Sequence, residues 1–303
     1  MLKYCTKRIL LAILTIFIVA AITFFAMNAI PGGPFNKEKA TSEAAKAVLE
    51  ARFNLDKPVG EQFILYLKNL MHGDFGVSLK SGRDISETIW GAFSVSAKLG
   101  GMAAAIAIVG GLLLGSIAAL TRNRWPDRAI IFVTTLFVSV PSFVLATILM
   151  LVFCLMLGWF NVFSTTDVNY LLPVISLALY PMSYITRLTK SSMLEVLGQD
   201  YVRTARAKGV TDFMVVLKHT LRNALIPVIT YVGPMIAYIL TGSMVVETVF
   251  NIGGLGTKFV SAINNQDYPM IMGTTIFLAT LMVIMTLLSD IVYKIVDPKI
   301  SFE

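Results

Sequence analysis

Residues 200–227 read DYVRTARAKGVTDFMVVLKHTLRNALIP, a basic stretch between two long apolar runs. Glycine is favoured just after the last residue of a helix, so Gly209 predicts a helix end. Thr211 or Asp212 can cap the start of a second helix, which would run into the following apolar residues. The stretch therefore predicts a helix, a tight turn and a second helix between two apolar runs.

The first of these helices would cover about residues 198–208, and Ser191 and Ser192 can cap a helix start before it. Its apolar side carries Tyr201, Val202, Ala205 and Val210, and its polar side carries Arg203, Arg206 and Lys208. The small residues Ala205 and Ala207 would let another surface approach closely. The pattern by itself fits two partners equally, an anionic lipid surface or a docking protein.

The composition of the whole chain indicates a membrane protein. Of its 303 residues, 56% are hydrophobic and only 14% are charged, and the mean hydropathy is +0.76. Soluble domains carry about 25% charged residues, so this chain has too little charge for an aqueous surface of its size. The net charge of +7 is better explained by basic cytoplasmic loops than by nucleic-acid binding.

Neither cysteine nor histidine forms a recognisable site. Cys5 and Cys154 are too few and too far apart to form a disulfide framework. His72 and His219 have no cysteine or carboxylate at ligand spacing, so we expect no metal site and no bound cofactor.

Six apolar runs are about as long as a membrane-spanning helix requires. They cover about residues 9–30, 97–121, 129–157, 170–188, 224–246 and 271–295. The first run is too long for the core of a signal peptide and ends in the sequence PGGP, so we interpret it as an uncleaved span. The chain is therefore expected to be an all-α polytopic membrane protein with six transmembrane helices.

The basic residues of the short loops predict the orientation, because such residues accumulate on the cytoplasmic side. The short loops assigned to the cytoplasm hold Arg122, Arg124, Arg128, Arg187, Lys190, Arg203, Arg206, Lys208, Lys218 and Arg222. The short loops assigned to the outside hold only Lys258. Both termini are therefore expected in the cytoplasm.

Residues 35–91 are more polar than the rest and carry mixed charges. With Pro58 able to open a helix, they predict a small helical cap outside the membrane. The expected organisation is therefore residues 1–34 with the first span, residues 35–91 as the cap, and residues 92–303 as a five-helix core. Gly111 and Gly115 within that core have the spacing that lets helices approach closely, and packing within the subunit is favoured over dimerisation.

Several blocks of the sequence resemble, in the same order, permease subunits of binding-protein-dependent ABC importers. The closest resemblance is to the first, B-type permease of the oligopeptide, dipeptide and nickel branch, over nearly the whole chain. The blocks are IPG at 30–32, LDKPV at 55–59, GDFGVSL at 73–79, DYVRTARAKG at 200–209, HTLRNALIP at 219–227, ETVFNIGGLG at 247–256 and DYPMIMG at 267–273. The broader importer pattern of the coupling loop is matched only at Ala205, Gly209 and Leu221. Gly253 replaces a usual proline, and Gly33 replaces a common acidic residue.

The resemblance implies an ABC type I importer permease fold, with residues 191–222 as a cytoplasmic coupling segment. It also implies a place in the cytoplasmic (inner) membrane of a bacterium or archaeon. It implies a C-type second permease, two cytoplasmic ATPase subunits that use ATP and Mg²⁺, and an extracytoplasmic substrate-binding protein as partners. The residues expected to contact an ATPase are Asp200, Tyr201, Arg203, Thr204, Ala205, Arg206, Lys208 and Gly209. The cap and the loops near 159–169 and 248–272 are expected to dock the binding protein. The expected cargo is an oligopeptide or dipeptide, with nickel or another small solute as the alternative.

Polar residues inside an apolar span are expected to face a cavity or another helix. The candidates for the translocation path are Tyr231, Tyr238, Thr241, Ser243 and Glu247. Hydrogen bonding between helices explains them about as well.

Other classes of membrane protein fit the sequence less well. The sequence has no G-x-x-x-x-G-K-[ST] phosphate loop and no H-E-x-x-H or G-x-S-x-G motif, so we expect a transport subunit without its own ATPase rather than an enzyme. A membrane enzyme would need paired catalytic groups at membrane depth. A secondary transporter would be expected to show inverted repeats, and no clear repeat is present.

Overall fold

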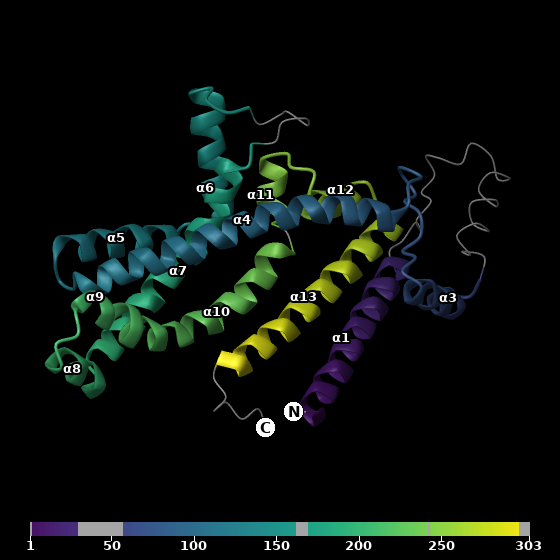
Figure 1. Ribbon diagram of the computed structural model, residues 1–303. Coiled ribbons are helices and arrows are strands. Elements are labelled where there is room, and N and C mark those ends of the chain that lie inside the picture. Colours follow the sequence, from purple (N-terminus) through teal and green to yellow (C-terminus); the bar gives the residue numbers. More distant parts are fainter. Residues whose placement is uncertain (1, 30–56, 162–168, 242, 297–303) are drawn as a thin grey trace. The chain divides into compact units, whose positions relative to one another are not determined.

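The computed structural model describes residues 2–29, 57–161, 169–241 and 243–296, most of which are helical (Figure 1). The chain divides into two compact units. The first unit comprises Met1–Ser94 and Gly254–Val283, and the second comprises Val95–Gly253 and Ile284–Glu303.

Among the described residues, five helical stretches are long and apolar enough to cross a membrane. They are α1 (Leu2–Ala29), α4 (Ile85–Leu120), α7 (Leu171–Leu197), α13 (Tyr268–Val296), and the run Asp212–Val249, which contains α10 (Arg222–Leu240) and α11 (Met244–Val249). Each exceeds the ~20 residues that a span needs. They coincide with five of the six expected spans, although α4 and α7 are longer than the apolar runs that predicted them.

The remaining expected span, 129–157, is not a straight helix. It is formed by α5 (Trp125–Ser139), α6 (Ser142–Leu149) and the π-helix η1 (Met150–Met156), with a bend of 99° between the two halves. Pro141 causes the break, because a proline disfavours helical backbone in the residue before it, and Val140 is extended at φ −96° and ψ 122°. The six expected spans are obtained when this bent pair is counted as one.

In the first unit, α3 (Val59–Met71) begins directly after Pro58, as the sequence predicts. It packs against α1 through aromatic rings: the Phe63 ring centroid lies 5.2 Å from that of Phe24 and 6.0 Å from that of Phe17. Residues 35–56 of the expected cap lie outside the described residues, so its full extent stays a prediction.

Asp267 joins two distant parts of the first unit just before α13. Its carboxylate accepts hydrogen bonds from the Ser78 hydroxyl and, at 3.1 Å, from the Leu79 backbone N–H. Asp267 and Ser78 are both buried. The GDFGVSL and DYPMIMG blocks, which follow separate helices in the sequence, therefore form one structural feature together with the short helix α12 (Leu255–Asn264).

In the second unit, glycines of α4 form a seam with α7 (Figure 1). A methyl group at Gly111 would lie 2.6 Å from Ile185 Cβ, and one at Gly115 would lie 2.6 Å from both the Thr186 carbonyl oxygen and Thr189 Cβ. These positions leave no room for a side chain, so the Gly111–Gly115 spacing serves packing within the subunit, as the sequence predicts.

Candidate functional site

The candidate coupling helix is α8 (Asp200–Ala207), which lies between α7 and α10 in the second unit (Figure 1). It ends as predicted at Gly209, whose φ of +78° suits glycine. The Gly209 N–H donates to the Arg206 carbonyl at 2.9 Å, and the Val210 N–H donates to the Ala205 carbonyl at 3.2 Å. This pair of bonds is the Schellman motif, which satisfies two carbonyl groups at the end of the helix.

The predicted start of this helix is wrong. Ser191 and Ser192 lie inside α7, which continues to Leu197, and Gly198 is the residue after its end. Gln199, with extended backbone at ψ 149°, separates the two helices. The prediction failed because the polar residues after the apolar run extend α7 by about two turns rather than beginning a new helix.

One face of α8 is covered by the chain itself. Val202 and Ala205 are buried in an apolar cluster with Val215, and Val196, Leu197 and Val210 pack against its edge. Ala205 is thus covered by neighbouring residues of the chain itself, and its contact with an ATPase stays a prediction. Val215 begins the π-helix η2 (Val215–Leu221), which follows α9 (Asp212–Met214) and leads into α10.

The opposite face of α8 is exposed and polar. Its exposed residues are Asp200, Tyr201, Arg203, Thr204, Arg206, Ala207, Lys208 and Gly209. Two ion pairs cross this surface, Arg203–Asp200 at 3.7 Å and Arg206–Asp212 at 3.6 Å. Exposed pairs of this kind contribute little to stability, so the arginines are available to a partner. Of the predicted coupling residues, all but Ala205 lie on this face, and their contact with an ATPase stays a prediction.

A hydrogen bond ties α8 to the start of α10. The Asn223 side-chain amide donates to the Tyr201 hydroxyl at 2.8 Å. Together with the Val202–Ala205 packing on α7 and η2, this bond holds α8 to two membrane helices at once. Helix α8 therefore contacts both the end of α7 and the start of α10. No sequence pattern predicted the role of Asn223, because a single asparagine does not identify its distant partner.

Tyr231, one of the two predicted path residues of α10, belongs to a group of tyrosines with Tyr180 and Tyr184. Tyr231 packs against Tyr184 of α7, with ring centroids 4.3 Å apart. Tyr180 lies one turn from Tyr184 on the same side of α7. The side chains of Tyr180, Tyr184 and Tyr238 are 45%, 42% and 72% exposed. Sequence reasoning missed Tyr180 and Tyr184, although their spacing of four residues on an apolar helix was a usable signal.

The other predicted path residues have local roles in this structure. The Thr241 hydroxyl donates to the Tyr238 carbonyl at 2.7 Å, and the Ser243 hydroxyl caps α11 by accepting from the Val246 N–H at 3.3 Å. Glu247 is fully buried and accepts a hydrogen bond from the Ser96 hydroxyl of α4 at 2.7 Å. The structure thus separates an exposed tyrosine group from a buried glutamate, and their part in a path stays a prediction.

In the part of the chain that the structure describes, no group of three or more histidine, cysteine, aspartate or glutamate residues is placed to hold a metal ion.

Comparison with known families agrees with this geometry. The family described as the inner membrane component of binding-protein-dependent transport systems matches residues 111–302, and its N-terminal companion family matches residues 1–96. The chain belongs to this permease family. It is therefore a multi-pass inner-membrane protein and a permease subunit of a transport system, not itself an enzyme.

Similar permeases cover the chain from end to end. The chain is 46% identical over 305 residues to the dipeptide transport system permease protein DppB of Bacillus subtilis, covering 100% of this chain and 99% of that protein. It is 43% identical to the oligopeptide transport system permease protein OppB of Haemophilus influenzae and 38% identical to OppB of Escherichia coli K12, each with 100% of both chains covered. The resemblance to the B-type permeases of the peptide branch is confirmed.

Solved structures support the fold. The inward-facing methionine transporter MetNI matches with a TM-score of 0.55 and 18% identity, over 69% of this chain and 95% of that chain. An amino acid ABC transporter crystallised with histidines matches with a TM-score of 0.54 and 14% identity, over 71% and 95%. At these identities the likeness concerns the fold alone, and it confirms the expected type I importer permease fold.

Proposed function

We propose that this permease forms one half of the membrane path of an ATP-driven importer of dipeptides or oligopeptides. The observation that carries the proposal is the full-length similarity to dipeptide and oligopeptide permeases, at 46% and 43% identity. No observation favours nickel or an ATPase-independent mechanism over this cargo and energy source.

The energy would come from partner subunits. The exposed face of α8, with Arg203, Arg206 and Lys208, would sit in a groove of a cytoplasmic ATPase subunit, which binds ATP and Mg²⁺. A polar surface suits this contact because it can form and separate in water without leaving a large apolar patch exposed. A second, C-type permease, a second ATPase and an extracytoplasmic binding protein would complete the importer.

This assignment implies an orientation. The α8 face would lie in the cytoplasm, and so would the basic turn before α5 and both termini. The excess of arginine and lysine on that side agrees with the usual distribution of charge across a membrane.

The tyrosine group supports a peptide path. Hydroxyl groups can bond to the peptide backbone, which is the same in every cargo, and the rings provide a broad apolar surface. Tyr180, Tyr184 and Tyr231 belong to membrane helices, where exposed hydroxyl groups are better placed against a cavity than against lipid. A path built this way would accept peptides of varied sequence.

The test is uptake into vesicles that contain the four membrane-associated subunits, driven by ATP and supplied with the cognate binding protein. Labelled trialanine should accumulate only when ATP is inside with the ATPases and the binding protein is outside. Vesicles without the binding protein and vesicles without ATP are the matched controls. Uptake of Ni²⁺ but not of trialanine, dialanine or tetra-alanine would contradict the peptide assignment.

A further inference from the structure

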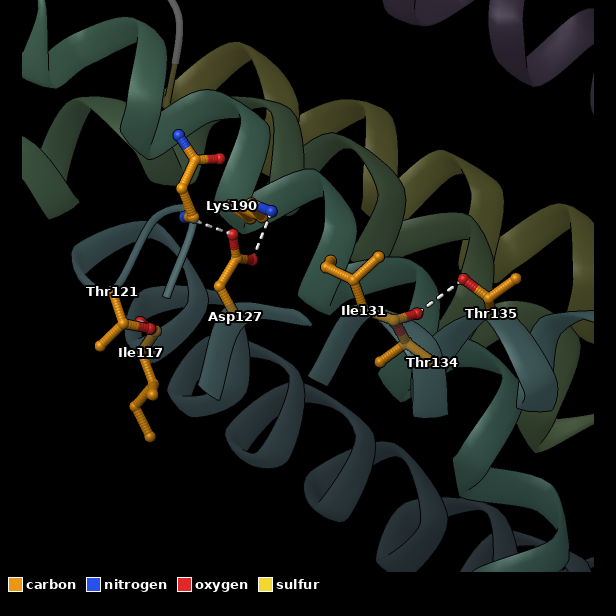
Figure 2. Close-up of polar contacts among 8 residues, drawn as sticks. Ile117, Thr121, Asp127, Ile131, Thr134, Thr135 and Lys190 are labelled. Atoms are coloured by element: carbon orange, nitrogen blue, oxygen red, sulfur yellow. Dashed lines mark hydrogen bonds and ion pairs between the residues drawn. The ribbon is translucent and has the colours of Figure 1, made fainter. Parts of the chain in front are cut away.

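A partly buried ion pair connects the turn between α4 and α5 with α7. The Lys190 ammonium of α7 donates to Asp127 Oδ1 in the first turn of α5, as Figure 2 shows. The other carboxylate oxygen, Asp127 Oδ2, accepts the Asn123 backbone N–H at 3.0 Å. The side chains of Asp127 and Lys190 are only 6% and 21% exposed. One carboxylate therefore holds both its own turn and the neighbouring helix.

The surroundings of this pair make α7 part of a larger body. Arg187, one turn before Lys190, donates to the Thr135 hydroxyl of α5 at 2.8 Å. On the α4 side, Gly115 leaves no space between its backbone and Thr186 or Thr189. Residues 186–190 of α7 are thus held by α5 through polar bonds and by α4 through close packing.

The pair lies close to the candidate coupling helix along the chain. Asp200, the first residue of α8, is the tenth residue after Lys190. The first seven of these steps, up to Leu197, are still in α7, which corresponds to about 10 Å at the α-helical rise of 1.5 Å per residue. Lys190 is therefore near the point where a force that enters through α8 would pass into the membrane helices.

A contribution to the stability of the fold does not by itself explain such an ion pair. Bringing two charges out of water is costly, and a well-packed apolar pair is often at least as stable. What an ion pair provides is a defined geometry, because it is satisfied in one arrangement and leaves a buried charge in others. That property suits a contact that must keep α7 and α5 in a fixed relative position while both helices move.

We propose that the Asp127–Lys190 pair is a positioning device that couples α8 to the α4–α5 hairpin. With the pair intact, a displacement of α8 moves α7, α4 and α5 together. Without the pair, the end of α7 moves but the α4–α5 hairpin does not move with it, so less peptide is transported for each ATP hydrolysed. Asp127 and Lys190 are positioning residues that touch neither the ATPase nor the cargo. The inference rests on the proposed function, because it requires an ATPase that acts on α8.

The test compares single and exchanged charges in the reconstituted importer. Asp127→Asn keeps a side chain of the same shape that can still accept from Asn123, but it removes the charge. Lys190→Met removes the opposite charge and keeps the length of the chain. The double variant Asp127→Lys with Lys190→Asp restores an ion pair in the reverse sense. Arg128→Gln, an exposed charge change beside Asp127, is the matched control.

The measured quantity is the ratio of ATP hydrolysed to labelled trialanine taken up. Both single variants are expected to assemble and to raise this ratio about fivefold or more, as for a lost coupling of ordinary size. The exchanged pair should lower the ratio again, and Arg128→Gln should keep the wild-type ratio. A role in packing alone would not produce recovery by charge exchange.

Two results would overturn the proposal. Single variants that assemble and keep the wild-type ratio would show that the pair is not needed for coupling. Single variants that do not co-purify with the ATPases would show that the pair serves assembly instead. Failure of the peptide assignment is distinguishable, because the wild-type importer itself would then take up no trialanine. Stimulation of ATP hydrolysis by the loaded binding protein would still report on the role of the Asp127–Lys190 pair.

Discussion

Helix α7 makes two very different contacts along its length. In its middle, Thr186 and Thr189 lie against the backbone of Gly115 with no room for one more methyl group. At its end, Val196 and Leu197 pack against the apolar cluster that contains Val202 and Ala205 of α8, and the other face of α8 is exposed. The difference separates a part of the permease that must stay rigid from a part that must present a surface. Three substitutions and one crosslinking experiment test this distinction, beginning with the largest expected effect on stability.

The largest effect is expected at the seam. Gly115→Ala would place a methyl group 2.6 Å from the Thr186 carbonyl oxygen, and backbone on both helices would have to shift. Overpacking of this kind costs about 1–3 kcal/mol, so thermal unfolding of the purified complex in detergent should occur at a lower temperature. Gly101→Ala on the same helix is the control, since no atom lies within 4 Å of the added methyl group. Equal melting temperatures for the two variants would show that the seam can open.

A smaller effect is expected at the end of α8. Gly209 has a φ of +78° and open space around it, so Gly209→Val costs only the backbone strain, about 1–2 kcal/mol. The loss should appear as reduced uptake with the subunit still present in the membrane, because α8 is no longer held in one orientation. Gly209→Asn is the matched control, since asparagine tolerates this backbone region. If valine transports as well as asparagine, the orientation of α8 does not depend on this turn.

The smallest effect on stability is expected at the link to α10. Tyr201→Phe removes the hydroxyl that accepts from Asn223, and a typical hydrogen bond contributes about 0.5–1.5 kcal/mol. Because this bond lies at an exposed site, the melting temperature should change little, while the ATP hydrolysed per peptide should rise. Asn223→Ala should produce the same change, and the double variant should be no worse than either single one. Additive losses would mean that the two side chains act separately.

The sequence predicted the parts of this fold that depend on local patterns. Long apolar runs predicted the spans, Gly209 predicted the end of α8, and the spacing of Gly111 and Gly115 predicted the seam. Each signal is carried by consecutive or closely spaced residues, so one stretch of chain is enough to interpret it.

The prolines show a feature that local sequence patterns do not predict, namely which helices are bent. Pro141 breaks its span with a bend of 99°, whereas Pro181, Pro227 and Pro234 lie inside continuous helices. Membrane helices tolerate proline when neighbouring groups satisfy the freed backbone, and the sequence does not say which neighbours will be present.

Pairings between distant polar residues also could not be predicted from the sequence. Asp127 with Lys190, Ser96 with Glu247 and Asn223 with Tyr201 are each joined by the packing of separate helices. An isolated polar residue in an apolar run indicates that a partner exists, since burying it alone is costly. It does not identify that partner, and the order of the helices in space must be known first.

The most direct test of the central claim is a crosslink from the exposed face of α8 to the ATPase. In a variant with Cys5 and Cys154 replaced by serine, a single cysteine is placed at Arg203, which is 74% exposed, or at Lys258, which is exposed and expected on the outer side. A short thiol crosslinker should join the Arg203→Cys permease to an ATPase subunit, with a yield that changes when ATP binds, and should leave the Lys258→Cys permease unlinked. Linkage at Lys258 without linkage at Arg203 would contradict both the coupling surface and the orientation.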